Sequence, residues 1–281
     1  MNLTWPIALA VLFGALLHAG WNALVKSAAD KALDTALLNL MGALMALPLL
    51  FAAGLPSASA WPWLIGSATV HVGYYSLLTA AYRHGELALT YPLMRGVAPL
   101  LVALTSTVAF AEPLSGAAWI GVLGVSCGVL VLGLSRHGLE SGRAVVLALA
   151  NAAVIALYTV IDGHGVRAGG NAVGYVALVF LLKGLPFGAL VVARRGWPAV
   201  RAHARRRAPV ASLGAAASLG SYGIALWAMT RAPVATVAAL RETSVLFAAL
   251  IGAWQLHEAF TPRRALGTAA ILAGVAALRL G

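Results

Sequence analysis

Long apolar segments separated by short polar connections follow one another along the whole chain. Each segment has about 20 residues, the length that an α-helix needs to cross the hydrocarbon core of a bilayer. Glycine, proline, serine or threonine marks the connections between them. The segments cover residues 3–24, 34–54, 61–83, 88–110, 115–134, 143–161, 171–193, 208–230, 234–255 and 262–280. The pattern predicts an all-α integral membrane protein with ten transmembrane helices.

Polar residues and glycines from the end of the first half of the chain recur in the second half. Arg95 and Arg241 lie 146 residues apart, and so do Glu112 and Glu258. The same spacing joins Gly121 to Gly267, Gly128 to Gly274, and Ser115 to Thr261, two residues that we expect to cap the helices that follow them. Such a duplication predicts two repeats of five helices, residues 1–137 and 138–281. Because each repeat has an odd number of spans, the second is expected to be inverted relative to the first.

Composition restricts the class of protein. Of the 281 residues, 61% are hydrophobic and only 10% are charged, which excludes a soluble domain. The single cysteine, Cys127, permits no intrachain disulfide. The sequence contains no phosphate-binding glycine loop, HExxH motif or nucleophile elbow. We therefore expect no enzyme activity, catalytic residue, metal or cofactor.

The positive charge of the chain is concentrated in alternate connections. The formal net charge is +11, and most basic residues follow odd-numbered segments, including six arginines within 194–207, which are expected to form a loop. The positive-inside rule places these connections in the cytoplasm and both termini outside, and it makes a nucleic-acid partner unnecessary to explain the charge.

Five ionisable residues lie inside the predicted helices, where a charge is costly and usually faces a cavity or a partner. They are His71, Arg95, Lys183, Arg241 and Glu242. The cations outnumber the carboxylate, which favours an anionic or zwitterionic solute. Two structural alternatives stay open, namely an ion pair between Lys183 and Glu242, and arginines that only tie helix ends together. Glu242 or His71 could exchange a proton with the solute pathway.

Further polar and aromatic residues are candidates to line the cavity. These candidates are Trp21, Asn22, Tyr75, Tyr158 and Trp227. Pro92 and Pro99 are expected to bend or loosen the helix around Arg95.

Two further patterns concern the helix ends and helix packing. Glu112 and Glu258 are expected to stabilise the N-terminus of the helix that follows each of them. Gly124 and Gly128 form a GxxxG pattern that predicts close helix packing and leaves monomer and homodimer open.

The stretch from Ala109 to Ser115, followed by Gly121 and Gly128, resembles the EamA family of the drug/metabolite transporter superfamily, as does its copy from Trp254 to Thr261. The resemblance implies ten helices in two inverted repeats, a central cavity, and export or exchange of small metabolites such as amino acids. Residues 18–22 and 158–167 resemble a subgroup associated with phosphonate use. Many relatives are thought to keep both termini in the cytoplasm, opposite to the orientation that the arginines indicate.

These observations predict a secondary transporter of the bacterial inner membrane that works by alternating access. Its expected partners are a small solute, membrane lipid and protons. One alternative is a flippase for polyprenyl-phosphate-linked head groups, and another is an intramembrane enzyme acting on lipid phosphates. The solute, the coupling ion and the direction of transport are not determined by the sequence.

Overall fold

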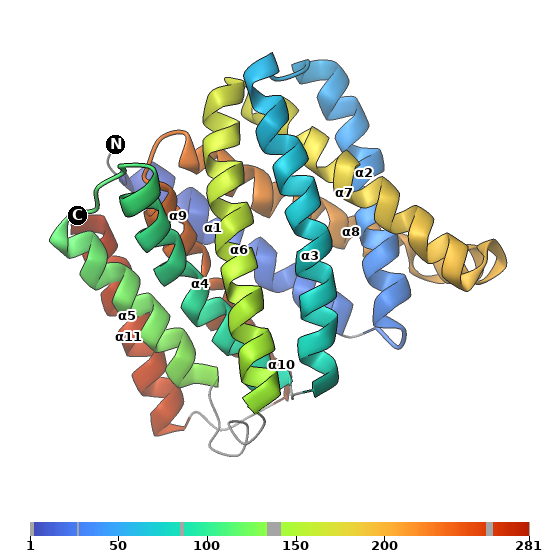
Figure 1. The fold of residues 1–281 in the computed structure, drawn as a ribbon. Helices are drawn as coiled ribbons and strands as arrows, with labels where there is room; N and C mark the ends of the chain where they lie inside the picture. The colour runs from blue at the N-terminus through green and yellow to red at the C-terminus, as the bar shows by residue number, and fades with distance from the viewer. Residues whose placement is uncertain (1–2, 27, 85–86, 134–141, 257–260, 281) are drawn as a thin grey trace.

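The computed structural model describes residues 3–26, 28–84, 87–133, 142–256 and 261–280, and within these ranges the regular structure is helical. Figure 1 shows a bundle in which the start of α1 and the end of α11 lie near each other. The elements are α1 (Trp5–Lys26), α2 (Lys31–Ala53), η1 (Ala58–Ala60), α3 (Trp61–His84), α4 (Leu87–Ala109), α5 (Gly116–Gly133), α6 (Gly142–Gly169), α7 (Ala172–Arg195), α8 (Trp197–Met229), α9 (Val234–Arg241), α10 (Ser244–Leu256) and α11 (Pro262–Leu280).

Eight stretches of the described chain are long and apolar enough to cross a membrane. One of them, Val234–Ile251, continues from α9 into α10, so these two short helices together form one crossing. The helices α3 and α11 are not among the eight, and α11 carries arginines close to both ends. The surface agrees with a lipid environment, because Trp5, Leu9, Phe13 and Leu16 form an exposed apolar stripe along α1.

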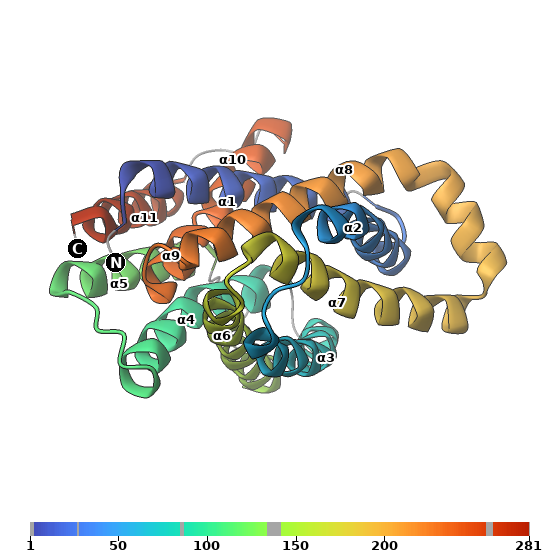
Figure 2. The same cartoon turned by 90° about the horizontal axis from the view of Figure 1, so that it is seen from above.

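Helices from the two halves of the chain pack against each other in pairs. The helix α5 packs along α11, α2 along α7, α3 along α6, and α1 along α8. Figure 1 shows α5 beside α11 and α3 beside α6, and Figure 2 shows α1 beside α8 in the view from above. The two halves therefore share one core.

Glycines make the pairing of α5 with α11 possible. A Cβ built on Gly128 would lie 2.7 Å from the carbonyl oxygen of Gly267, and one built on Gly124 would lie 2.9 Å from Cα of Gly274. Both distances are shorter than van der Waals contact, so these positions accept no larger residue without helix separation. The GxxxG pattern is thus used for packing inside the chain, as its sequence predicted, and it carries no indication of a dimer.

The arginine-rich stretch is helical, so the prediction of a loop over 194–207 is wrong. The helix α7 continues to Arg195, the chain reverses at Gly196, and α8 begins at Trp197. Gly196 has φ +80°, a conformation that favours glycine, and Pro198 lies in the first turn of α8, where proline is well tolerated. Alanine and arginine are both strong helix formers, which explains why the polar composition did not end the helix.

The interruption of a helix occurs in the second half of the chain rather than at the prolines of the first. The helix α4 is continuous through Pro92 and Pro99, whereas the predicted helix over 234–255 is divided between α9 and α10. At this break the hydroxyl of Thr243 donates to the carbonyl oxygen of Leu240 at 2.7 Å, and the amide of Glu242 donates to Ala239. These bonds between residues three apart replace the regular α-helical bonds at the break. Arg241 and Glu242 consequently face the interior.

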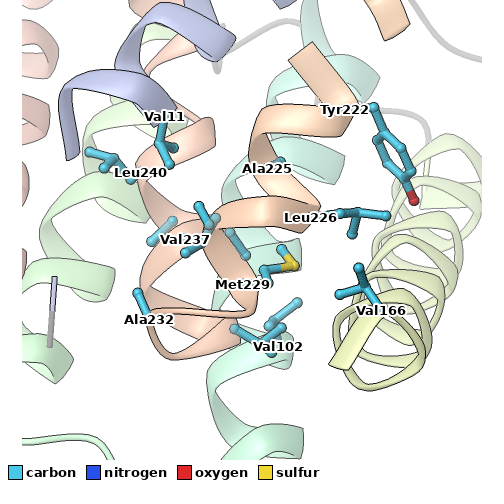
Figure 3. Packing of buried hydrophobic residues seen from close by; sticks show 14 of the residues in the cluster. Val11, Val102, Val166, Tyr222, Ala225, Leu226, Met229, Ala232, Val237 and Leu240 are labelled. Atoms are coloured by element: carbon cyan, nitrogen blue, oxygen red, sulfur yellow. The ribbon is translucent and has the colours of Figure 1, made fainter. Parts of the chain in front are cut away.

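Buried aliphatic residues around α8 and α9 form the part of the core that holds this break in place. Figure 3 shows Leu226 and Met229 of α8 packed with Val237 and Leu240 of α9, with Val102 of α4 close by. All five have relative exposures of 0–1%. The short helix α9 is therefore fixed by its surroundings, because eight residues alone form no stable helix.

Candidate functional site: a charged cavity inside the bundle

Arg95 near the middle of α4 and Arg241 at the end of α9 face the same small cavity. The residues that line it are Arg95, Ala98, Pro99, Val102, Ile155, Tyr158, Thr159, Ala238, Arg241 and Glu242. Its volume of about 10 Å³ gives room for about one water molecule. The structure is therefore closed around the cavity, and the helices must move apart before a metabolite can enter.

Glu242 forms an ion pair with Arg95. The Nε of Arg95 lies 2.7 Å from Oε2 of Glu242, and both side chains are less than 10% exposed. The Nη2 of Arg95 also lies 3.4 Å from the hydroxyl of Ser244, at the start of α10. The ion pair that the sequence left open between Lys183 and Glu242 does not form, because Glu242 follows the helix break and faces α4.

Lys183 and Arg241 contact aromatic rings instead of carboxylates. The ammonium of Lys183 lies 3.9 Å from the centre of the Phe180 ring and 4.9 Å from that of Tyr222. The guanidinium of Arg241 lies 5.6 Å from the same Tyr222 ring. Among the described residues, neither cation forms an ion pair. Cation–π contacts of this kind are weaker than a buried ion pair, so both cations can accept an anion.

Asp162 is a buried carboxylate that the sequence did not select as a site residue. Its Oδ1 accepts a hydrogen bond of 2.9 Å from the hydroxyl of Tyr175, and its Oδ2 accepts one from the hydroxyl of Tyr222. Asp162 is completely buried in α6. Figure 3 shows the hydroxyl of Tyr222 directed toward this helix. Asp162 follows the predicted segment 143–161 by one residue, whereas α6 continues to Gly169 and so carries it inside the helix. A longer segment would have placed this aspartate among the costly charges that were selected.

His71 and Tyr158 meet next to the cavity. Their ring centres lie 4.5 Å apart, and Nδ1 of His71 lies 2.8 Å from the carbonyl oxygen of Ser67 in its own helix. His71 and Lys183 line a second, smaller hollow between α3 and α7. Tyr222 lies between this hollow and the cavity, since both Lys183 and Arg241 pack on its ring.

The remaining candidates are dispersed. The side-chain amide of Asn22 donates to the carbonyl oxygen of His18 at 2.7 Å, and the ring of Trp21 lies 5.1 Å from that of His18. Trp227 lies in the last turn of α8 with Arg231 over its ring, and neither Trp21, Asn22 nor Trp227 lines the cavity. The side chain of Tyr75 and all of Glu258 lie outside the described residues. The described residues contain no group of His, Cys, Asp and Glu that could hold a metal ion.

One face of the bundle is closed by a polar network around Arg167. Its guanidinium donates to Oε1 of Glu112 at 3.0 Å, to the carbonyl oxygen of Met229 at 2.6 Å and to that of Ala232 at 2.9 Å. The amide of Val234 donates to Oε2 of Glu112 at 3.3 Å. Glu112 therefore stabilises the N-terminus of α9 rather than that of the next helix.

The helices that follow Glu112 and Glu258 are capped by hydroxyls, as predicted. Ser115 accepts from the amide of Ala118 at 3.1 Å, and Thr261 accepts from that of Arg264 at 3.3 Å.

A second polar cluster lies where α2 begins and α8 emerges. Asp34 accepts bonds from Nε and Nη2 of Arg207 at 3.1 and 2.7 Å, and its Oδ1 lies 2.8 Å from Nε2 of His203. Arg207 also reaches the carbonyl oxygen of Leu24 at 3.4 Å. The basic start of α8 is thus tied to α1 and α2, at the ends of these helices remote from the Arg167 network.

A bundle of apolar helices around a closed, charged cavity defines a polytopic membrane protein. Residues 142–280 match the EamA-like transporter family, and the chain belongs to that family, as its resemblance indicated. The protein is a transmembrane transport protein of a family of transporters rather than enzymes.

Comparison with curated proteins gave no match, whereas 29 chains of solved structures match. One of them, described only as "Crystal structure of protein", is 20% identical and has a TM-score of 0.74. The match covers 98% of this chain and 95% of that one, and it supports the fold.

Proposed function

We propose that the protein is a secondary transporter of small anionic or zwitterionic metabolites, such as amino acids or phosphonates, in a bacterial inner membrane. The observation that carries this proposal is that Arg241 and Lys183 lie inside the helical bundle and form no ion pair with any carboxylate in the described part of the chain. A buried cation is costly unless it is compensated, and a bound anion provides that compensation. Arg95 lies in the same cavity and could contribute once Glu242 releases it.

We further propose ten crossings in two inverted repeats, residues 1–137 and 138–281, that alternate in opening to the two sides. The packing pairs support this. In the proposed repeats, α1, α2, α3 and α5 correspond to α6, α7, α8 and α11. The pairs α5–α11 and α2–α7 then each join two corresponding helices, and the pair α3–α6 is equivalent to the pair α8–α1. The closed cavity fits an occluded intermediate of such a cycle.

The polar clusters support the proposed alternation of the connections between the two sides. Asn171, between α6 and α7, donates to the carbonyl oxygen of Ala53 at the end of α2, at 2.7 Å. Arg167 joins the α4–α5 and α8–α9 connections. We place the opposite face, with its arginines at the start of α8, in the cytoplasm. Glu242 and His71 remain the proposed sites of proton exchange.

The proposal is tested by ligand-dependent thermal stability of the purified protein, followed by uptake into proteoliposomes. Anions and zwitterions are expected to raise the midpoint of unfolding, because a ligand that binds only the folded protein stabilises it. Lys183→Ala should abolish that stabilisation and leave the ligand-free protein folded.

Arg201→Ala is the matched control, since it removes one positive charge from an exposed position at the start of α8. Equal stabilisation of wild-type protein and Lys183→Ala would contradict the role of Lys183. Stabilisation by lipid-linked phosphates alone would indicate a flippase instead.

A further inference from the structure

The charged residues that line the cavity or contact Tyr222 comprise one more cation than carboxylate. Arg95, Arg241 and Lys183 are positive, and Asp162 and Glu242 are negative. The solute-free site therefore carries a net charge of +1. Resting on the proposed function, we infer that the site is built for a solute that brings one negative charge and no ammonium group.

Both carboxylates already have a partner. Both oxygens of Asp162 accept tyrosine hydroxyls, and Asp162 does not line the cavity. Glu242 does line it, but its Oε2 holds Arg95 at 2.7 Å. An ammonium on Glu242 would compete with the buried guanidinium of Arg95 for the same carboxylate and weaken this ion pair. An amino acid would thus bind at the expense of the pair between Arg95 and Glu242.

A monoanion meets no such obstacle. Its oxygens can bind Arg241 in the cavity, while the pair between Arg95 and Glu242 stays intact. Lys183, which lines the second hollow, contacts the same Tyr222 ring as Arg241 and adds its positive charge nearby. A single negative charge reduces the net charge of the site to zero, whereas a dianion would reverse its sign. The two cations lose only their contacts with aromatic rings.

The rest of the cavity wall indicates what the remainder of the solute should be. Besides the charged residues, Tyr158 and Thr159, the lining is aliphatic, consisting of Ala98, Pro99, Val102, Ile155 and Ala238. An aliphatic wall favours an apolar substituent over a second charged group. The class that fits is a monocarboxylate, or a singly charged phosphonate, with a small apolar tail.

Propionate, alanine and succinate test this class, because the other two compounds each differ from propionate by one added charged group. Alanine has an additional ammonium, and succinate has a second carboxylate. Calorimetric titration of the wild-type protein in detergent is expected to give propionate a dissociation constant at least tenfold lower than that of either other ligand. The result should be the same for butyrate, 2-aminobutyrate and glutarate.

The charge count is tested separately by Glu242→Gln, which raises the net charge of the interior to +2. Succinate should then gain affinity relative to propionate by about tenfold, a change that general loosening of the fold would not produce. A melting curve verifies that the variant is folded, and Lys183→Met, which lowers the net charge to zero, should weaken both ligands.

The outcomes separate this inference from the proposed function. If alanine binds as tightly as propionate or more tightly, and Lys183→Ala abolishes its binding, the protein is a transporter of zwitterions and the inference is overturned. An unchanged ratio of succinate to propionate in folded Glu242→Gln also overturns it. If none of the six compounds binds and no anion stabilises the protein, the proposed function fails as well.

Discussion

Removing the carboxylate of Glu112 should open the face of the bundle that the Arg167 network closes. Glu112 lies between α4 and α5, and its two oxygens accept bonds from Arg167 and from the amide of Val234. Arg167 also holds the carbonyl oxygens of Met229 and Ala232, at the end of α8 and beyond it. The network therefore joins α6, the α4–α5 connection and the start of α9, which must separate if this face is to open.

The magnitude follows from the bonds that are lost in Glu112→Ala. The variant loses one charge-assisted bond from Arg167 and one from a backbone amide, at a site where both side chains are at most 20% exposed. Bonds to charged groups contribute about 1.5–3 kcal/mol each, and partial exposure reduces this, so we expect a loss of about 2–4 kcal/mol. Because these bonds exist only in the closed arrangement, the open population should rise by about 30- to 1,000-fold.

Cysteine labelling in proteoliposomes measures this population. In a Cys127→Ser background, Ala98→Cys places a thiol in the cavity wall, and a membrane-impermeant maleimide is applied from the side of the Arg167 network. The labelling rate should rise by the same factor in Glu112→Ala as long as the closed form dominates. Arg195→Ala is the control. It removes an exposed ion pair of 3.6 Å between Arg195, the last residue of α7, and Asp30, and it should change the labelling rate little.

An unchanged labelling rate in Glu112→Ala, with the fold intact, would refute the network as a closure of this face. A rate that rises equally for reagent applied from both sides would indicate general loosening, which would also refute it.

Three further substitutions, with Gly20→Ala as the control for the first, test local features of the fold through the free energy of unfolding in detergent. Gly128→Ala should lower it by about 1–3 kcal/mol, because the new methyl group meets the α11 backbone, whereas Gly20→Ala, which meets nothing within 4 Å, should raise it by up to about 1 kcal/mol. Ala111→Gly should raise it by about 1 kcal/mol, since Ala111 has φ +48° ahead of Glu112. Tyr222→Phe should lower it by about 1–3 kcal/mol by removing a donor from a buried carboxylate. The opposite sign in any of the three would contradict the packing or bonding described for that residue.

Features that depend on local sequence were predicted well. Segment length and hydropathy predicted the all-helical architecture, although the bounds of α8 and the division between α9 and α10 differ from the prediction. The hydroxyl caps at Ser115 and Thr261 followed from the residue types that accept from a helix N-terminus. The close packing implied by Gly124 and Gly128 was also correct. Each of these rests on interactions within a few residues, or on a property such as apolar length that one segment has by itself.

Features that depend on partners distant in the sequence were not predictable in the same way. The pairing of Glu242 with Arg95 required a break in the helix, and no glycine or proline marks residues 242–243. The break is fixed by packing around α9, which a single segment does not show. Glu112 likewise interacts with α6 and α9 rather than with the helix that follows it. A charge in an apolar segment could be recognised from the sequence, but its partner could not.

A difference between the two halves of the chain at one position contributes to the charge around the cavity. Arg95 and Arg241 lie 146 residues apart and correspond in the proposed repeats, but the residue after Arg241 is Glu242, whereas the residue after Arg95 is Gly96. A Cβ built on Gly96 would lie 2.6 Å from Cγ of Leu130 and 3.2 Å from the carbonyl oxygen of Ser126, so a side chain there would have to displace Leu130 of α5. The first half of the chain thus supplies an arginine and close packing, and the second half supplies an arginine, a helix break and a carboxylate. Among the described residues, Glu242 pairs with Arg95 and not with Arg241. Under the proposed function, Arg241 is therefore the arginine that binds the solute anion.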